Sequence, residues 1–269
     1  MPGKRGPAPA KAVAGQVQSL TRGLSILECL AKAEGGLTLT DIGLRVQLPP
    51  STVHRLLATL EKMGYVYQAG ELGRWYVGLQ AFTVGSSFLS SRDFIAQSHP
   101  FMRRLMDQSG ETVNLAILDG TEAVFVDQVQ CREMMRTIVK LGSRAPLHAS
   151  GVGKAMFASL PDDQIDAILK VRGLPRITGN TITTPETMWA SIRVIRQRGW
   201  SFDDEEHAQG TRCVASPIYD EHAETLGAIS LAGPSSRLPD DRIRQLGPLV
   251  AHAAEELTHR LGGKWPHGR

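Results

Sequence analysis

The segment His148-Ala149-Ser150-Gly151-Val152-Gly153-Lys154-Ala155 combines residue types found in several catalytic motifs. It is not a P-loop, because His148 stands where that motif needs glycine and Ala155 where it needs serine or threonine. Met156 replaces the third glycine of a dinucleotide fingerprint, and a nucleophile elbow would also need glycine at position 148. A glycine turn that opens a helix remains. One alternative is that its glycines are present for backbone geometry alone. The other is that the turn exposes the N–H groups of Gly151, Val152 and Gly153 to a small anion.

Two further chemistries stay open as alternatives in this half of the chain. An enzyme acting on a small organic acid would use Cys213 or Ser150 as nucleophile and His148 or His207 as base, but no local nucleophile motif supports it. A metal-responsive regulator would use the oxygen, nitrogen and sulfur ligands of Asp203, His207 and Cys213, which lack a paired-ligand spacing. We therefore expect no catalytic residue, no bound metal and no cofactor.

Positive charge is concentrated in the first 80 residues. This part holds nine lysines and arginines against five acids, a net charge of +4, whereas the remainder carries −1. A basic N-terminal third joined to a near-neutral body is expected when only one domain binds a polyanion. The charge asymmetry therefore favours a nucleic-acid partner for the N-terminal part.

The elements of this basic third are typical of a DNA-binding unit. Apolar residues at helical spacing predict one helix from Ser19 to the Gly35-Gly36 pair and another from Ser51 to Gly64. Residues 40–48 are ambiguous, since they alternate like a strand but open with the helix-starting pair Thr40-Asp41. Two β-rich runs, 65–67 and 75–77, predict a hairpin. Helices followed by a hairpin indicate a winged helix-turn-helix, whose recognition helix would begin near Ser51.

Beyond residue 78 the pattern changes to strands interleaved with helices. Asp119-Gly120 predicts a hairpin turn between strands at 113–118 and 123–129. Further strands are expected at 136–141, 213–219 and 226–231, and helices at 154–159, 162–170, 185–198 and 239–261. This mixture indicates an α+β domain with a mainly antiparallel sheet.

Length and composition set the outer limits. The 269 residues, 42% hydrophobic and 21% charged, suit two globular domains. No apolar run approaches the roughly 18 residues of a membrane span, and the first residues lack the apolar core of a signal peptide. We therefore expect a cytosolic protein without a membrane partner. Cys29, Cys131 and Cys213 lie far apart without a Cys-x-x-Cys pair, which argues against a disulfide framework.

Several motifs resemble the isocitrate lyase regulator (IclR) family. The runs Gln18-Ser19-Leu20-Thr21-Arg22-Gly23-Leu24 and Leu48-Pro49-Pro50-Ser51-Thr52-Val53-His54-Arg55-Leu56-Leu57 are similar to its DNA-binding domain. Residues 199–206, followed by Cys213-Val214-Ala215-Ser216-Pro217-Ile218-Tyr219-Asp220, are similar to its effector-domain signature. Residues 109–114 and 147–151 match as well. The resemblance covers roughly residues 16–262, and it identifies 40–48 as the first helix of the helix-turn-helix.

The resemblance implies a transcription regulator, more often a repressor than an activator, controlled by a small carboxylate metabolite. The partners it implies are double-stranded DNA with an inverted-repeat operator and a second copy of the chain, as a homodimer or a dimer of dimers. The expected parts are a flexible basic arm at 1–15, a winged helix-turn-helix domain at 16–78, a linker helix at 79–97, a GAF-like effector-binding domain at 98–262 and a tail at 263–269.

Candidate site residues follow for both domains. For DNA we expect contacts from Ser51, Thr52, His54, Arg55, Arg22 and Arg74, with Lys4, Arg5 and Lys11 of the arm. For the effector, the resemblance implies a pocket formed by Gly151, Val152, Gly153, Asp203, Cys213, Ser230, Thr137, Ala145 and Thr211. Where one member of the family carries larger apolar side chains, this chain has Thr137, Ala145 and Thr211. Smaller walls leave more room, so we expect a carboxylate larger or more hydroxylated than pyruvate.

Overall fold

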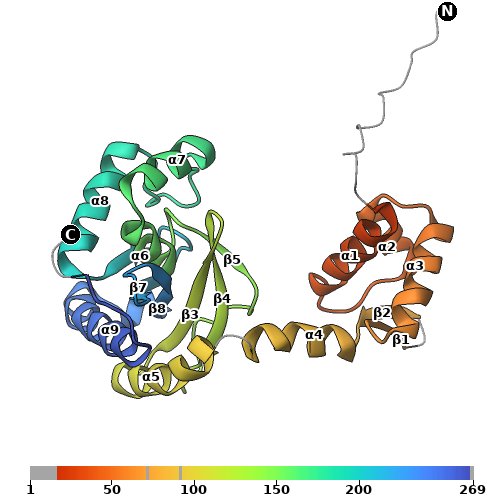
Figure 1. Ribbon diagram of the computed structural model, residues 1–269, viewed down its shortest axis with the longest axis horizontal. Helices are drawn as coiled ribbons and strands as arrows, with labels where there is room; N and C mark the ends of the chain where they lie inside the picture. Colours follow the sequence, from red (N-terminus) through yellow and green to blue (C-terminus); the bar gives the residue numbers. More distant parts are fainter. Residues whose placement is uncertain (1–16, 71–72, 91–92, 267–269) are drawn as a thin grey trace, which may run out of the picture. The chain divides into compact units, whose positions relative to one another are not determined.

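The computed structural model describes residues 17–70, 73–90 and 93–266 (Figure 1). The chain divides into two compact units, Met1–Ser91 and Arg92–Arg269, each with its own hydrophobic core. The basic arm, with Lys4, Arg5 and Lys11, lies outside the described residues. Among the described helices, none is long and apolar enough to cross a membrane.

The N-terminal unit is a helix-turn-helix followed by a hairpin. Its elements in chain order are α1 (Gln18–Ala31), α2 (Leu39–Val46), α3 (Pro50–Lys62), β1 (Val66–Ala69), β2 (Arg74–Val77) and α4 (Leu79–Ser90). Strands β1 and β2 pair in antiparallel register, from Val66 opposite Val77 to Ala69 opposite Arg74. The core is built from one side of α1, α2 and α3 and from the hairpin, and its buried residues include Ile26, Leu30, Ile42, Val53, Leu57 and Trp75.

The ambiguous segment 40–48 is helical, as the family resemblance implied. Thr38 and Asp41 form a capping box, in which the Thr38 hydroxyl accepts a hydrogen bond from the Asp41 N–H and the Thr38 N–H donates to the Asp41 carboxylate. Ile42 is buried, whereas Leu44 is exposed. The strand-like alternation is therefore produced by an exposed leucine on a short helix.

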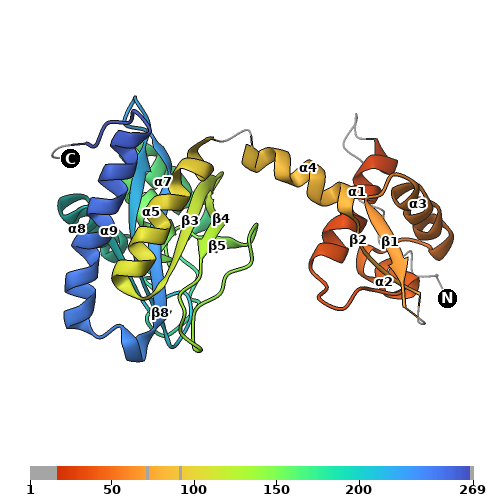
Figure 2. The ribbon, with the colours of Figure 1, turned by 90° about the horizontal axis from the view of Figure 1, so that it is seen from below.

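The C-terminal unit is α+β, with an entirely antiparallel sheet. Within the described residues the six strands lie in the order β5-β4-β3-β8-β7-β6. Figure 2 shows helices α5 and α9 next to each other, and both contact this sheet. The bounds are α5 (Asp93–Ser109), β3 (Thr112–Asp119), β4 (Glu122–Val129), β5 (Arg144–Pro146), α6 (Gly151–Ser159), α7 (Asp162–Arg172), α8 (Pro185–Arg198), β6 (Ser201–Asp204), β7 (Thr211–Tyr219), β8 (Thr225–Pro234), a 3₁₀ turn (Ser235–Arg237) and α9 (Asp240–Arg260).

The two faces of this sheet differ in side-chain size. Large aliphatic residues such as Leu115, Val214 and Leu231 pack against α5 and α9. The opposite face carries small residues, including Ala116, Ala215 and Ala228, and packs against α6, which in turn contacts α8 (Figure 1). Small side chains let α6 lie close to the strands.

The prediction of a strand at 136–141 is wrong. Residues 130–143 have no regular structure, and the edge strand is β5, Arg144–Pro146, which pairs with residues 122–124 of β4. Ile138 and Leu141 are largely exposed. The expected strand does not form because a strand needs a pairing edge, and the chain reaches β4 only at Gly142, whose N–H donates to the Phe125 carbonyl at 2.8 Å.

Helix α4 and the start of α5 occupy residues 79–97, where a single linker helix was expected. The finer domain boundaries stay predictions. The likeness of the C-terminal unit to a GAF domain also stays a prediction. The tail packs on the C-terminal unit as far as it is described. Trp265 stacks edge to face on Tyr219, with ring centres 5.4 Å apart.

Candidate nucleic-acid interface and effector site

The turn between α2 and α3 fixes how the second helix projects. Gln47 ends α2 in the left-handed conformation, with φ of 54°, and Pro50 begins α3. Gly43 faces the Leu48 carbonyl so closely that a β-carbon there would lie 3.1 Å from its oxygen. A residue with a side chain would therefore force the turn before α3 to move by a few tenths of an ångström.

Helix α3 buries one side and exposes the other. Val53 and Leu57 are fully buried, whereas Ser51, His54 and Arg55 are exposed and Thr52 is half-buried. No acid lies in the first turn of α3. A helix of this kind can enter the major groove, where short polar residues and an arginine near its N-terminus reach base edges and phosphates.

The other two expected DNA contacts occupy different surroundings. Arg22 is exposed on α1. Arg74 is half-buried, and its guanidinium donates a hydrogen bond of 3.0 Å to the Gly36 carbonyl. Arg74 therefore joins the hairpin to the loop between α1 and α2, and a contact with DNA would have to come from its remaining donors.

In the C-terminal unit, four expected effector residues meet beside the N-terminus of α6. Asp203 on β6 lies opposite Cys213 on β7, and Ser230 on β8 lies opposite Ala215, on the same face of the sheet. This face contacts α6, because the Ser201 hydroxyl donates to the Gly151 carbonyl at 2.7 Å. A β-carbon on Gly151 would lie 2.5 Å from the Cys213 sulfur, so glycine is required there for packing.

Helix α6 begins with a side-chain cap that sequence reasoning did not anticipate. The Ser150 hydroxyl accepts a hydrogen bond of 3.1 Å from the Gly153 N–H and donates one of 2.8 Å to the Pro146 carbonyl. One of the three N–H groups expected to bind an anion is therefore already engaged. The Val152 N–H interacts as a hydrogen-bond donor with the Cys213 sulfur.

Thr137, Ala145 and Thr211 are not gathered at this point. Thr211 follows the same face of β7 toward the end of the sheet, opposite Pro234. Ala145 lies on β5 and Asp203 on β6, the opposite edges of the sheet, and Thr137 lies in the irregular segment before β5. A pocket that includes all nine expected residues would therefore have to extend across the sheet.

A buried ion pair lies next to Asp203. The Lys154 ammonium on α6 donates to the Glu206 carboxylate and to the Phe202 carbonyl, and all of these side chains except Phe202 are at least nine-tenths buried. The Glu206 N–H in turn donates to Asp203 Oδ1 at 2.8 Å. The sequence did not predict that Lys154 and Glu206 form a buried pair, because lysine and glutamate are almost always exposed unless paired and no motif links these two positions.

Burial dominates the electrostatics of this cluster. It raises the pKa of Asp203 to about 7, against the opposing effects of the Lys154 ammonium and the backbone donors. Burial, and after it the Asp203 carboxylate, raises the pKa of the Cys213 thiol to about 12. Burial, followed by the neighbouring His148, lowers the pKa of His207.

These groups do not form the alternative sites considered from the sequence. Burial raises the pKa of the Cys213 thiol to about 12, and a protonated thiol of this kind is a poor nucleophile. The Ser150 hydroxyl donates to a backbone carbonyl, and His148 Nε2 lies 2.9 Å from the Pro175 carbonyl oxygen. Among the described residues, no group of three or more His, Cys, Asp or Glu side chains is placed to hold a metal ion.

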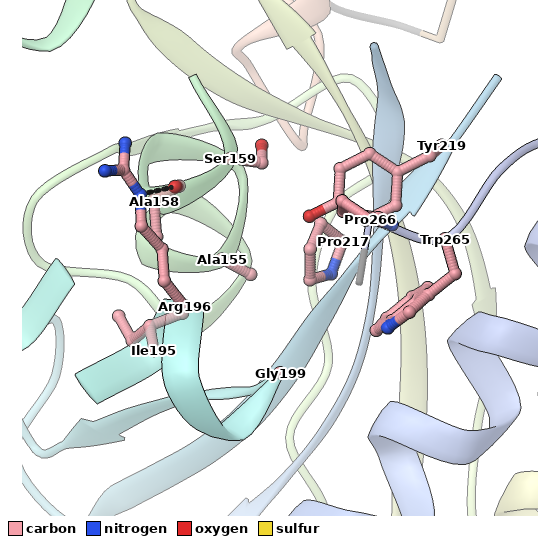
Figure 3. Close-up of a pocket in the computed structure, with 10 residues that line it drawn as sticks. All are labelled: Ala155, Ala158, Ser159, Ile195, Arg196, Gly199, Pro217, Tyr219, Trp265 and Pro266. Atoms are coloured by element: carbon pink, nitrogen blue, oxygen red, sulfur yellow. Dashed lines mark hydrogen bonds between the residues drawn. The ribbon is translucent and has the colours of Figure 1, made fainter. Parts of the chain in front are cut away.

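A separate cavity of about 40 Å³ lies at the other end of α6, between α6, α8 and the C-terminal tail (Figure 3). Its cation, Arg196, donates to the carbonyls of Ala158 and Leu160 at 2.8 and 2.9 Å. A space that holds little more than one water molecule, beside an engaged guanidinium, does not suit an organic acid.

Comparison with known proteins agrees with both halves of this description. Residues 19–70 match the IclR helix-turn-helix domain, and residues 86–259 match the C-terminal domain of bacterial transcriptional regulator IclR. The chain is 50% identical over 268 residues to the acetate operon repressor of Salmonella typhimurium, covering 98% of each chain. It is 43% identical to the transcriptional repressor AllR of Klebsiella pneumoniae, covering 98% of this chain and 95% of the relative.

Among solved structures, a transcriptional regulator from Rhodococcus superposes with a TM-score of 0.83 at 29% identity, covering 92% of this chain and 99% of the other. The named relatives are DNA-binding regulators and not enzymes. The chain therefore belongs to the IclR family of helix-turn-helix transcriptional regulators.

Proposed function

We propose that this chain is a dimeric repressor that binds an inverted-repeat operator through α3 and releases it when a small carboxylate binds the C-terminal unit. The observation that carries the proposal is the exposed polar face of α3, with Ser51, His54 and Arg55, on a helix whose other side is locked into the core. Repression is the sign supported by the named relatives.

An exposed apolar groove supports dimerisation. Leu20 and Leu24 on α1, Met63 after α3 and Val84 on α4 line a groove of about 680 Å³ in the N-terminal unit, and each of these side chains is about half exposed or more. The groove also borders Arg55 on α3, so the surface proposed for the second copy adjoins the surface proposed for DNA. Large exposed apolar patches on soluble proteins mark interaction sites. A second copy of the chain is the occupant we propose, because a two-fold dimer presents two recognition helices to two half-sites.

The cluster beside α6 supports the carboxylate site. Within the described residues, one carboxylate oxygen of Glu206 is buried without a hydrogen-bond partner, and the buried Ser230 hydroxyl has only the weakly accepting Cys213 sulfur beside it. Buried polar atoms of this kind normally have a partner, so a ligand or ordered water is expected nearby. The preference for an acid larger or more hydroxylated than pyruvate rests on the family resemblance alone, because Thr137, Ala145 and Thr211 do not lie together beside α6.

The test is operator binding and its release. DNA flanking the gene for this chain would be used in gel-shift titrations at physiological salt, with glyoxylate, pyruvate, glycerate, malate and hydantoate added in turn. We expect a fragment with an inverted repeat to be bound, and glycerate, malate or hydantoate to release it at lower concentration than the two smaller acids.

Two outcomes would contradict the proposal. Inserting five base pairs between the half-sites rotates one of them by half a turn, so unchanged affinity would exclude the two-fold dimer. Release by none of the five acids would exclude control by small carboxylates of these classes. Tightest action by glyoxylate or pyruvate would contradict only the expected size of the ligand.

A further inference from the structure

The buried cluster beside α6 holds one more acid than base. Lys154 is matched by Glu206, to which its ammonium donates directly. Asp203 is buried in the same place, with about 4% of its surface exposed, and has no cation of its own. An ionised carboxylate in such a position is costly unless hydrogen bonds or charges compensate it.

The two oxygens of Asp203 differ in their surroundings. Oδ1 accepts hydrogen bonds from the N–H groups of Glu206 at 2.8 Å and of His207 at 3.3 Å. Both hydrogen bonds that the structure shows at the Asp203 side chain end on Oδ1. A proton on Oδ2 would leave both bonds to Oδ1 intact and would turn Asp203 into a hydrogen-bond donor.

The charged and titratable neighbours do not remove this excess acid. From α6, Lys154 favours the ionised form of Asp203, whereas Glu206, on the turn after β6, opposes it. His207, on the same turn, has a lowered pKa because of burial and His148, so it is a poor source of positive charge at neutral pH. From β7, the Cys213 thiol stays neutral, because burial raises its pKa to about 12.

A ligand carboxylate would add a further negative charge here. The N-terminus of α6 contacts Cys213, which pairs directly with Asp203, so an anion bound by the backbone of Gly151 would lie close to the Asp203 carboxyl. Two facing carboxylates that share a buried site cannot both ionise easily.

We propose that this site, taken as the effector site of the proposed function, binds its anionic ligand together with one proton, and that Asp203 holds this proton on Oδ2 and donates it to the ligand in a hydrogen bond. The proton comes from solvent when the ligand binds and returns to solvent when the ligand leaves, so that no other bond changes. Effector binding thereby becomes linked to pH.

The expected pH dependence follows from the ligand-free protein. Burial raises the pKa of Asp203 to about 7, so this carboxyl is mostly protonated at pH 6 and mostly ionised at pH 8. If the bound ligand raises the pKa well above 8, affinity falls nearly tenfold per pH unit once the pH passes 7. Below pH 6 it levels off, as long as the ligand itself stays ionised.

Isothermal titration calorimetry measures the proton directly. The full-length protein is titrated with glyoxylate, pyruvate, glycerate, malate and hydantoate, and the acid that binds most tightly is repeated in phosphate and in Tris, whose ionisation enthalpies differ. We expect uptake of about 0.9 proton per site at pH 8 and about 0.1 at pH 6. Asp203→Asn should abolish the uptake, and Asp204→Asn, a carboxyl on the same strand but facing the other side, should preserve it.

The outcomes separate this inference from the function on which it rests. Binding without proton uptake at pH 8, or uptake unchanged in Asp203→Asn, overturns the inference and leaves the repressor proposal standing. Binding by none of the five acids overturns both the carboxylate site and the inference. If Asp203→Asn does not fold, ¹³C NMR of aspartate carboxyls in the wild type decides. One buried carboxyl should titrate near pH 7 in the free protein and remain protonated at pH 8 with bound acid.

Discussion

Asp203→Asn should change how the stability of the C-terminal unit depends on pH, even without a ligand. Asp203 is buried in the folded chain, and its folded-state pKa of about 7 exceeds the ordinary value of 3.8. The folded state therefore binds more protons than the unfolded state between these two values. Its contribution to stability is fully present below pH 4 and is lost as the pH rises through 7.

The size of the effect follows from the two pKa values. A shift of about three units corresponds to roughly 4 kcal/mol over the whole range, and the part that falls between pH 5 and pH 8 is roughly 2.5 kcal/mol. Asparagine keeps an oxygen to accept the N–H groups of Glu206 and His207 but does not ionise. The variant should therefore gain stability relative to the wild type as the pH increases.

Urea unfolding of the wild type and of Asp203→Asn at pH 5, 6, 7 and 8 measures this difference. Asp241→Asn, an exposed aspartate in the first turn of α9, serves as the control and should follow the wild type at each pH. Parallel stability curves for the wild type and Asp203→Asn would refute the reasoning, because they would mean that Asp203 has the same pKa in both states.

Further substitutions test the other parts of the account. Arg55→Ala should weaken operator binding by about 1–3 kcal/mol in anisotropy titrations without lowering the melting temperature, whereas Lys32→Ala, exposed at the end of α1, should change binding little. Leu57→Ala should destabilise the N-terminal unit by about 2–5 kcal/mol in urea unfolding, since Leu57 is fully buried. Gly151→Ala should lower the melting temperature because its methyl group meets the Cys213 sulfur, and Gly151→Ala with Cys213→Ala should recover most of the loss; no recovery would contradict that contact. Leu24→Asp should weaken dimerisation in sedimentation experiments, and an unchanged dimer would exclude the α1 groove as its interface.

The DNA-binding half was predictable because its signals are local. Pro50 at its start and the apolar spacing through Val53 and Leu57 predict helix α3. The two β-rich runs predict the hairpin. The helix at 40–48 could be predicted only from the family resemblance. Leu44 is exposed, so the apolar residues do not follow helical spacing, and the capping hydrogen bonds of Thr38 cannot be detected from that spacing.

The effector half was predictable in its elements but not in its contacts. The signature residues Asp203 and Cys213 do meet, since the strands that carry them pair in register. The Lys154–Glu206 ion pair joins residues 52 positions apart and follows no motif, and nothing in the sequence distinguishes a buried lysine from an exposed one. The strand predicted at 136–141 was wrong for a related reason. Whether β4 offers a free edge for pairing depends on the folded sheet, which the sequence pattern does not describe.

Operator binding as a function of salt tests the central claim most directly. Fluorescence anisotropy of the full-length protein with DNA flanking its gene, compared with random DNA of equal length, should give at least about a thousandfold preference at physiological salt. The logarithm of affinity should fall steeply and linearly with the logarithm of salt concentration, with a shallower slope for Arg55→Ala if that guanidinium contacts phosphate. Equal affinity for flanking and random DNA at physiological salt would contradict the assignment of this chain as an operator-binding repressor.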